Sequence, residues 1–168
     1  FGILGFARET AAIFDKKSVD PAWFCEKANL PAVADKLEKP NVKIADAKLC
    51  ARYEGQVFAG FDASRDFDAV KKTLIVRSGA RPISPIVDVT NYLMFLTGQP
   101  LHAFDYDKLK KVSPTGKPDI LVRAAKDGEK LALLDGREIE LAEKDIVICA
   151  GDETKSVPIA LAGAVGGA

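Results

Sequence analysis

The chain has 168 residues, 48% of them hydrophobic, so it is long enough to bury a sizeable core. Its 24 Lys and Arg balance 24 Asp and Glu, which argues against a protein that holds nucleic acid by excess positive charge alone. No apolar run approaches the roughly 18 residues of a membrane span. The three cysteines (Cys25, Cys50 and Cys149) form no CxxC pair, which argues against a zinc or redox site, and without a signal peptide they favour a reducing compartment.

The N-terminal part of the sequence predicts two helices followed by two strands. Apolar residues recur at helical spacing over 3–14, and a second short helix is expected around 21–28, in a region punctuated by prolines. The stretches VKIA (42–45) and CARYEGQVFAGF (50–61) are typical of strands. In the longer of these, the alternation from Val57 onward predicts that at least one face is buried.

Two further helices are predicted by the signals at their ends. The first spans 66–78, with Asp66 as its expected N-cap and Gly79 just past its end. The second follows an N-cap at Ser84, has a proline at its first helical position, and ends at Gly98. These signals place both helices in the middle of the chain.

The last third of the sequence is rich in predicted strands. Five short apolar runs follow one another there: DILVRAA, KLALL, EIEL, DIVICA and VPIALAGAV. The dipeptide Asp135-Gly136 between the second and third runs predicts a β-hairpin. Helices followed by a meander of strands predict an α+β fold, with helices packed against mixed or antiparallel sheets, rather than alternating βαβ units.

Several common catalytic motifs are absent from the sequence. It contains neither the GxSxG of α/β-hydrolases nor the GxxxxGK[ST] of phosphate-binding loops, and GAVGGA near its end does not satisfy GxGxxG. His102 is the only histidine and therefore the one candidate for histidine-based acid–base chemistry. A lone histidine beside apolar neighbours such as Leu101 and Phe104 is more often a hydrogen-bonded packing residue than a catalyst, so spacing alone favours packing and leaves catalysis as the alternative.

Polar residues near His102 in the sequence add to this candidate site. Thr90 and Asn91 lie on the preceding helix and offer a hydroxyl and an amide to a substrate. A threonine in a helix commonly donates a hydrogen bond to the backbone of its own helix instead, so a purely structural role is also possible for Thr90. If residues 102–105 are extended, Asp105 points away from His102 and is a poor orienting partner for it.

The stretch RPISPIVDVTNYLMFLTGQPLHAFDYDKL (81–109) resembles the β subunit of bacterial phenylalanyl-tRNA synthetase. Further stretches resemble the same family in the same order: LGFARETAAI (4–13), LCARYEGQVFAGF (49–61), GEKLALLDGREIEL (128–141), DIVICA (145–150) and PIALAGAVGG (158–167). The similarity spans nearly the whole chain. It implies that residues 1–168 are a B3/B4-type editing module with a sandwich-like sheet core, and we expect the chain to be a piece of a longer subunit.

In that family the module hydrolyses tyrosine wrongly attached to the phenylalanine tRNA, and the resemblance implies the same post-transfer editing here. It also implies the following site residues: His102 and Thr90 as catalytic residues, Ala162 and Gly163 as the wall of the tyrosyl pocket, and Asn91, Pro100 and Ala103 at its border. A glutamate that reads the tyrosine hydroxyl falls beyond Ala168, so the chain by itself is expected to discriminate poorly.

The resemblance further implies a phenylalanyl-tRNA synthetase α subunit as partner, in a heterotetramer, together with tRNA(Phe), in the cytoplasm and away from membranes. ATP and Mg²⁺ belong to amino-acid activation by the α subunit, and no cofactor or metal is expected in this segment. Two alternatives stay open. In the first, the chain is a non-catalytic module that positions tRNA or supports the subunit interface. In the second, it is a freestanding relative of the module that binds another ligand.

Overall fold

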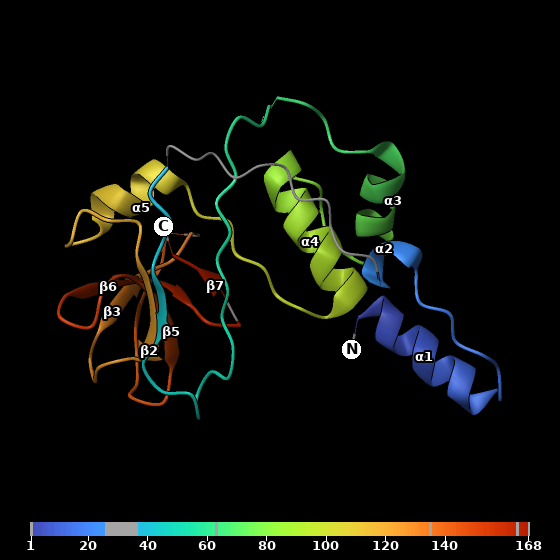
Figure 1. Ribbon diagram of the computed structural model, residues 1–168, viewed down its shortest axis with the longest axis horizontal. Coiled ribbons are helices and arrows are strands. Elements are labelled where there is room, and N and C mark those ends of the chain that lie inside the picture. Colours follow the sequence, from blue (N-terminus) through green and yellow to red (C-terminus); the bar gives the residue numbers. More distant parts are fainter. Residues whose placement is uncertain (1, 26–36, 63, 135, 164, 168) are drawn as a thin grey trace. The chain divides into compact units, whose positions relative to one another are not determined.

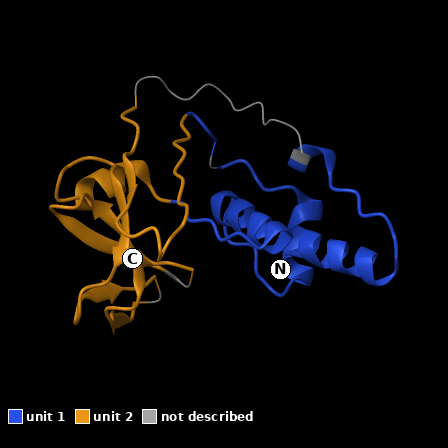
Figure 2. Cartoon of the chain, turned by 60° about the horizontal axis from the view of Figure 1, so that its bottom comes forward, with its two compact units in different colours: residues 1–32, 60–103 blue, residues 33–59, 104–168 orange. Residues whose placement is uncertain are grey.

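The computed structural model describes the chain in five stretches, residues 2–25, 37–62, 64–134, 136–163 and 165–167. The chain forms two compact units (Figure 2). Unit 1 comprises Phe1–Ala32 and Gly60–Ala103, and unit 2 comprises Val33–Ala59 and Phe104–Ala168. The second part of unit 1 therefore interrupts unit 2 in the sequence.

Unit 1 is helical (Figure 1), with α1 (Ile3–Ile13), α2 (Ala22–Cys25), α3 (Ala69–Arg77) and α4 (Pro85–Thr97). The four predicted helices are confirmed, except that the end of the second, residues 26–28, lies outside the described residues. Both α1 and α3 pack against α4. Gly2, the N-cap of α1, is buried against the last turn of α4, where any Cβ would overlap the backbone of Thr97 and Gly98. Only glycine allows this approach.

The start of α3 differs from the sequence-based expectation. Asp68, and not Asp66, is its N-cap, and the Asp68 carboxylate accepts a hydrogen bond from the backbone N–H of Lys71 at 3.0 Å. The carboxylate of Asp66 pairs with the ammonium group of Lys72 instead. The two aspartates give the same signal in the sequence, and only the one closer to the first free N–H groups of the helix can cap them.

Both predicted ends of α4 are confirmed. Ser84 is the N-cap, and Gly98 ends the helix in the left-handed conformation with φ 78°. Asp88, in the first turn, is buried, and its carboxylate accepts a hydrogen bond from the backbone N–H of Ile83 at 2.8 Å. This bond fastens the segment that precedes α4 to the helix.

Unit 2 is built on a five-stranded sheet of order β1-β2-β5-β6-β7, where β1 is parallel to β2 and the other pairs are antiparallel. The strands are β1 (Val42–Ile44), β2 (Ile120–Ala124), β5 (Ile146–Gly151), β6 (Ser156–Leu161) and β7 (Val165–Gly166). A separate hairpin joins β3 (Lys130–Ala132) and β4 (Glu138–Glu140) where it is predicted, although Asp135 lies outside the described residues. The α+β class is confirmed.

Two apolar clusters form the core of unit 2. Alternate residues of the central strands enter opposite clusters, as the period of two in a strand requires. Leu121 and Cys149 pack with residues of the β3–β4 hairpin, whereas Val122 and Ile148 pack with Leu109 of α5 (Tyr106–Val112). The sheet is therefore covered on both faces, by the hairpin on one and by α5 on the other.

One expectation about local structure fails at the border of unit 2, and one helix of this unit was not predicted. Residues 50–61 form no strand. Phe58 and Phe61 would point to opposite faces of a strand, yet both are exposed, so neither face is buried. Gly60, with φ 70°, also turns the chain within this stretch. The sequence also gave no indication of α5, which is too short for its periodicity to be recognised. Its N-cap is Asp105, whose carboxylate accepts from the N–H of Lys108 at 2.9 Å.

None of the helices described here combines the length and the apolar character that crossing a membrane requires.

Candidate functional site

The seven residues of the expected site are divided between the two units. Unit 1 holds Thr90 and Asn91 on α4 and three residues on the segment that follows this helix, namely Pro100, His102 and Ala103. Unit 2 holds Ala162 and Gly163, in the turn between β6 and β7. The structure thus groups the residues by unit, five in unit 1 and two in unit 2.

On α4, Thr90 and Asn91 are both half-buried. The hydroxyl of Thr90 donates a hydrogen bond to the backbone carbonyl of Val87, one turn earlier, at 2.8 Å. Because a hydroxyl has a single proton, Thr90 in this arrangement can only accept a hydrogen bond from a further partner. The proton of the Thr90 hydroxyl is therefore used within the helix, and Thr90 can contact a substrate only through the lone pairs of its hydroxyl oxygen.

The segment after α4 leads the chain from the helix to His102. Gly98 reverses the direction in its left-handed conformation, and the N–H of Gln99 donates to the hydroxyl of Thr97 at 3.1 Å. Pro100 and Ala103 are exposed, whereas His102 is half-buried. The position of His102 is thus fixed by a capped helix end and by a proline of restricted φ.

The protonation of His102 follows from its surroundings. Burial lowers the pKa of the imidazole below its ordinary value of 6.5. The ring is consequently neutral at pH 7, with one nitrogen as acceptor and the other as donor. A neutral, half-buried imidazole is able to take a proton from water or to form a hydrogen bond with an ester. The protonation state of His102 is therefore compatible with a catalytic role.

In unit 2, Ala162 and Gly163 form a tight turn. Ala162 is half-buried, and its N–H donates to the carbonyl of Ile146 at 2.9 Å. Gly163 is exposed with φ 71°, and a Cβ at this position would meet no atom within 4 Å. Within this unit, therefore, glycine is required here by the backbone conformation and not by lack of space.

Close backbone packing explains a second glycine of the same stretch. A Cβ on Gly167 would overlap the carbonyl oxygen of Ile159, to which the N–H of Gly167 donates at 2.8 Å. Gly167 thus lies directly against β6, at a distance that only glycine allows. Within the described stretches, no group of three or more His, Cys, Asp or Glu side chains is arranged to hold a metal ion.

The fold and the site together define an α+β protein with a mixed sheet and a single neutral histidine as its candidate for acid–base chemistry. The sequence model of the B3/4 domain matches residues 49–168, which are more than two thirds of the chain. The chain belongs to the B3/4 domain family.

Individual relatives agree with this family. The chain is 38% identical over 165 residues to the phenylalanine–tRNA ligase beta subunit of Trichormus variabilis. The aligned region covers 98% of the chain and 19% of the relative. It is 40% identical to the subunits of the same name from Dehalococcoides mccartyi and Nocardia farcinica, over 98% and 100% of the chain and 18% of each relative. The chain thus spans less than one fifth of the length of these relatives.

Proposed function

We propose that the chain is the B3/4 part of a phenylalanine–tRNA ligase β subunit and hydrolyses tyrosine from mischarged tyrosyl-tRNA(Phe). The observation that carries this proposal is the identity of 38–40% along nearly the whole chain to subunits of that name, with His102 in the matched region. The physical need is clear. A pocket shaped for phenylalanine rejects the same ring with one extra hydroxyl only weakly, so a second, hydrolytic site has to remove the error.

In the proposed reaction, water attacks the carbonyl carbon of the tyrosyl ester. The bond to the ribose oxygen breaks, and that oxygen takes up a proton as it leaves. The role of His102 is to hold or polarise the ester end of the substrate or the attacking water. Its neutral imidazole is in the protonation state that this role requires at pH 7.

The other site residues bind the substrate in this proposal. Thr90 accepts a hydrogen bond, since its proton is engaged by Val87. Ala162 and Gly163 form the wall beside the tyrosyl ring, where their small size leaves room, and Asn91, Pro100 and Ala103 border the site. No covalent enzyme intermediate is part of the reaction.

The proposal extends to the complete enzyme. It includes an α subunit that activates phenylalanine with ATP and Mg²⁺, a heterotetrameric assembly, tRNA(Phe) as the nucleic-acid ligand, and a cytoplasmic location. It also includes a glutamate beyond residue 168 that reads the tyrosine hydroxyl. A buried hydroxyl without such a partner is penalised, so the glutamate supplies the discrimination against phenylalanine.

The test is His102→Ala in the complete enzyme. Deacylation of tyrosyl-tRNA(Phe) should fall by about 100-fold or more, the usual contribution of a positioned acid–base group, while charging with phenylalanine persists. His102→Gln separates the two roles, because it keeps a hydrogen-bonding side chain of similar length that cannot exchange a proton near pH 7. Unchanged deacylation in His102→Ala would return this residue to a packing role.

The pH dependence of deacylation gives a second test of the same residue. Because burial depresses the pKa of His102, the rate should be level near pH 7 and fall on acidification with a midpoint below 6.5. The measurement is single-turnover deacylation between pH 5 and 8, with His102→Gln as the control that lacks this titration. A midpoint above 6.5 contradicts the assignment.

A non-catalytic role, in which the module positions tRNA or supports the subunit interface, is the second candidate. Two observations favour it: the Thr90 hydroxyl bonds its own helix, and the backbone conformation alone accounts for Gly163. A version of the chain extended past residue 168 discriminates between the two. Hydrolysis of tyrosyl-tRNA(Phe) by this version supports editing, whereas tRNA binding without hydrolysis supports the scaffold.

A further inference from the structure

Unit 2 contains a hollow of about 350 Å³ that is lined by none of the residues assigned to hydrolysis. Arg123 of β2 and Lys126 just after it form one side. Thr154, Lys155 and Ser156, where the chain turns from β5 into β6, form another. We call this group of five residues the basic hollow.

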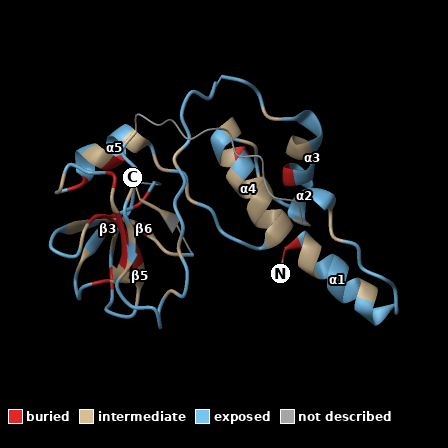
Figure 3. Cartoon of the chain, in the orientation of Figure 1, coloured by how far each residue is buried: buried red, intermediate tan, exposed pale blue. Residues whose placement is uncertain are grey.

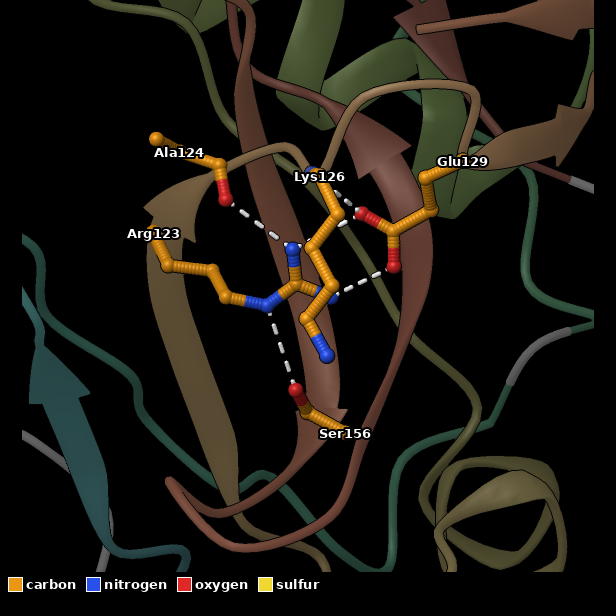
Figure 4. A network of polar contacts seen from close by, with 5 residues as sticks. All are labelled: Arg123, Ala124, Lys126, Glu129 and Ser156. Carbon is orange, nitrogen blue, oxygen red and sulfur yellow. Dashed lines mark hydrogen bonds and ion pairs between the residues drawn. The ribbon is translucent and has the colours of Figure 1, made fainter. Parts of the chain in front are cut away.

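A network of hydrogen bonds fixes Arg123 in the basic hollow (Figure 4). Its guanidinium group donates to both carboxylate oxygens of Glu129, at 2.6 and 2.8 Å, to the carbonyl of Ala124 at 2.9 Å and to the hydroxyl of Ser156 at 3.2 Å. The side chains of Arg123 and Glu129 are only 10% and 16% exposed. This bidentate pair is rigid, and Glu129 offsets the charge of Arg123, so Arg123 shapes the wall.

The net positive charge of the basic hollow comes from its two lysines. Lys126 and Lys155 are exposed, and neither ammonium group forms an ion pair within the described part of the chain. In Figure 4 the Lys126 side chain runs past the guanidinium group of Arg123, and its ammonium end lies on the side of Ser156. Glu153, the one acidic residue of the lining, pairs with Lys43 at 3.3 Å.

We propose that the basic hollow binds a phosphate group of an RNA backbone. The side chains of Lys126, Lys155 and Ser156 line a space with room for a phosphate, and ammonium and hydroxyl groups are among those that proteins direct at phosphate oxygens. The hydroxyl of Thr154 donates to the carboxylate of Asp152 at 2.6 Å, so Thr154 only shapes the wall. The chain as a whole is neutral, so such a local concentration of unpaired positive charge marks one place for an anion. The choice of RNA as the source of the phosphate rests on the proposed function.

The test compares two double variants of the intact subunit that carries this chain. Lys126→Ala/Lys155→Ala removes the charge of the basic hollow, and Lys39→Ala/Lys48→Ala removes two exposed lysines of the same unit elsewhere. The probe is unacylated tRNA(Phe), titrated by fluorescence anisotropy at several NaCl concentrations. We expect the first variant to bind several-fold more weakly at low salt, with a log–log salt slope smaller by about 1 to 2, and the second to bind like the wild type.

Two further arms make the result decisive. Lys126→Arg/Lys155→Arg should restore the salt slope, because it keeps both charges. Equal losses in the two alanine variants, or no loss in either, overturn the proposal. So does binding of inorganic phosphate to the wild type when tRNA affinity is insensitive to both lysines, because the hollow then serves free phosphate. Since the titration involves no hydrolysis, a failure here is distinct from a failure of the editing proposal.

Discussion

The two units bury their apolar residues to different extents (Figure 3). Among the described residues, Ile75 is the one buried hydrophobic residue of unit 1, and no residue of α1 is buried. Unit 2 holds every other buried hydrophobic residue, in two clusters on the sheet. The difference teaches that the sheet is stabilised by its own core, whereas the helices depend more on caps, glycines and a few contacts.

The largest effect on this comparison is expected from Ile148→Ala. Ile148 is 1% exposed in the centre of the sheet, so its truncation should lower the free energy of unfolding by roughly 2–5 kcal/mol. The measurement is urea unfolding of the 168-residue chain followed by far-UV circular dichroism. Val157→Ala, at a site on β6 that is 40% exposed, is the control and should cost less than about 1 kcal/mol. Equal losses would contradict the assignment of the core.

The single tryptophan sharpens this experiment. Trp23 lies on α2 in unit 1, so its fluorescence reports on the helical unit. Ile148→Ala leaves every contact within unit 1 in place, and the unfolding midpoint seen by Trp23 should therefore move less than the midpoint seen by circular dichroism. Equal shifts of the two midpoints would show that the two units unfold as one.

A smaller effect is expected from Glu129→Gln, which leaves the guanidinium group of Arg123 without its ionic partner. The loss should be about 2 kcal/mol, because the pair is largely buried but not fully so. The hydrogen bonds from Arg123 lower the pKa of Glu129 below 4.5. Its stabilisation is therefore present above pH 4.5 and is lost as the pH falls through the lower, folded-state pKa. A variant whose stability equals that of the wild type at pH 7 would argue against this pair.

The smallest effect on stability is expected from replacing a glycine with positive φ by alanine, at one chosen position in each unit. Gly79→Ala and Gly163→Ala introduce a Cβ at φ 90° and 71° where no atom lies within 4 Å, so each should cost about 1 kcal/mol of backbone strain. In the complete enzyme, Gly163→Ala should also slow deacylation of tyrosyl-tRNA(Phe), whereas Gly79→Ala should not. If Gly163→Ala changes stability alone, this glycine is needed only for the turn.

Most helices and strands of the chain could be predicted because their signals are local. The proline after Ser84 and the glycine at position 98 define α4 at both ends, and the five apolar runs of the last third of the chain all contribute strands. The errors occur where local signals are ambiguous. Asp66 and Asp68 compete for the same cap, and residues 50–61 have the alternation of a strand but no neighbouring strand to pair with.

The candidate site was less predictable, because its residues act through distant partners. His102 was named from the sequence, but its lowered pKa depends on burial that no local pattern specifies. Outside that site, the bidentate contact of Arg123 and Glu129 was not predicted either. Six positions separate these residues, and only the turn after β2 brings them together.

The parallel pairing of β1 with β2 has a consequence for the order of folding. Val42 pairs with Ile120, so the edge of the sheet closes only across the whole of the intervening chain, which contains α3, α4 and α5. Contacts so far apart in the sequence form slowly, because the entropy of closing the loop is lost before the contact is gained. On a ribosome, the helices of unit 1 emerge well before the sheet can be completed. Until β2 has been synthesised, the backbone groups of Val42 and Ile44 lack the strand with which they pair in the folded sheet.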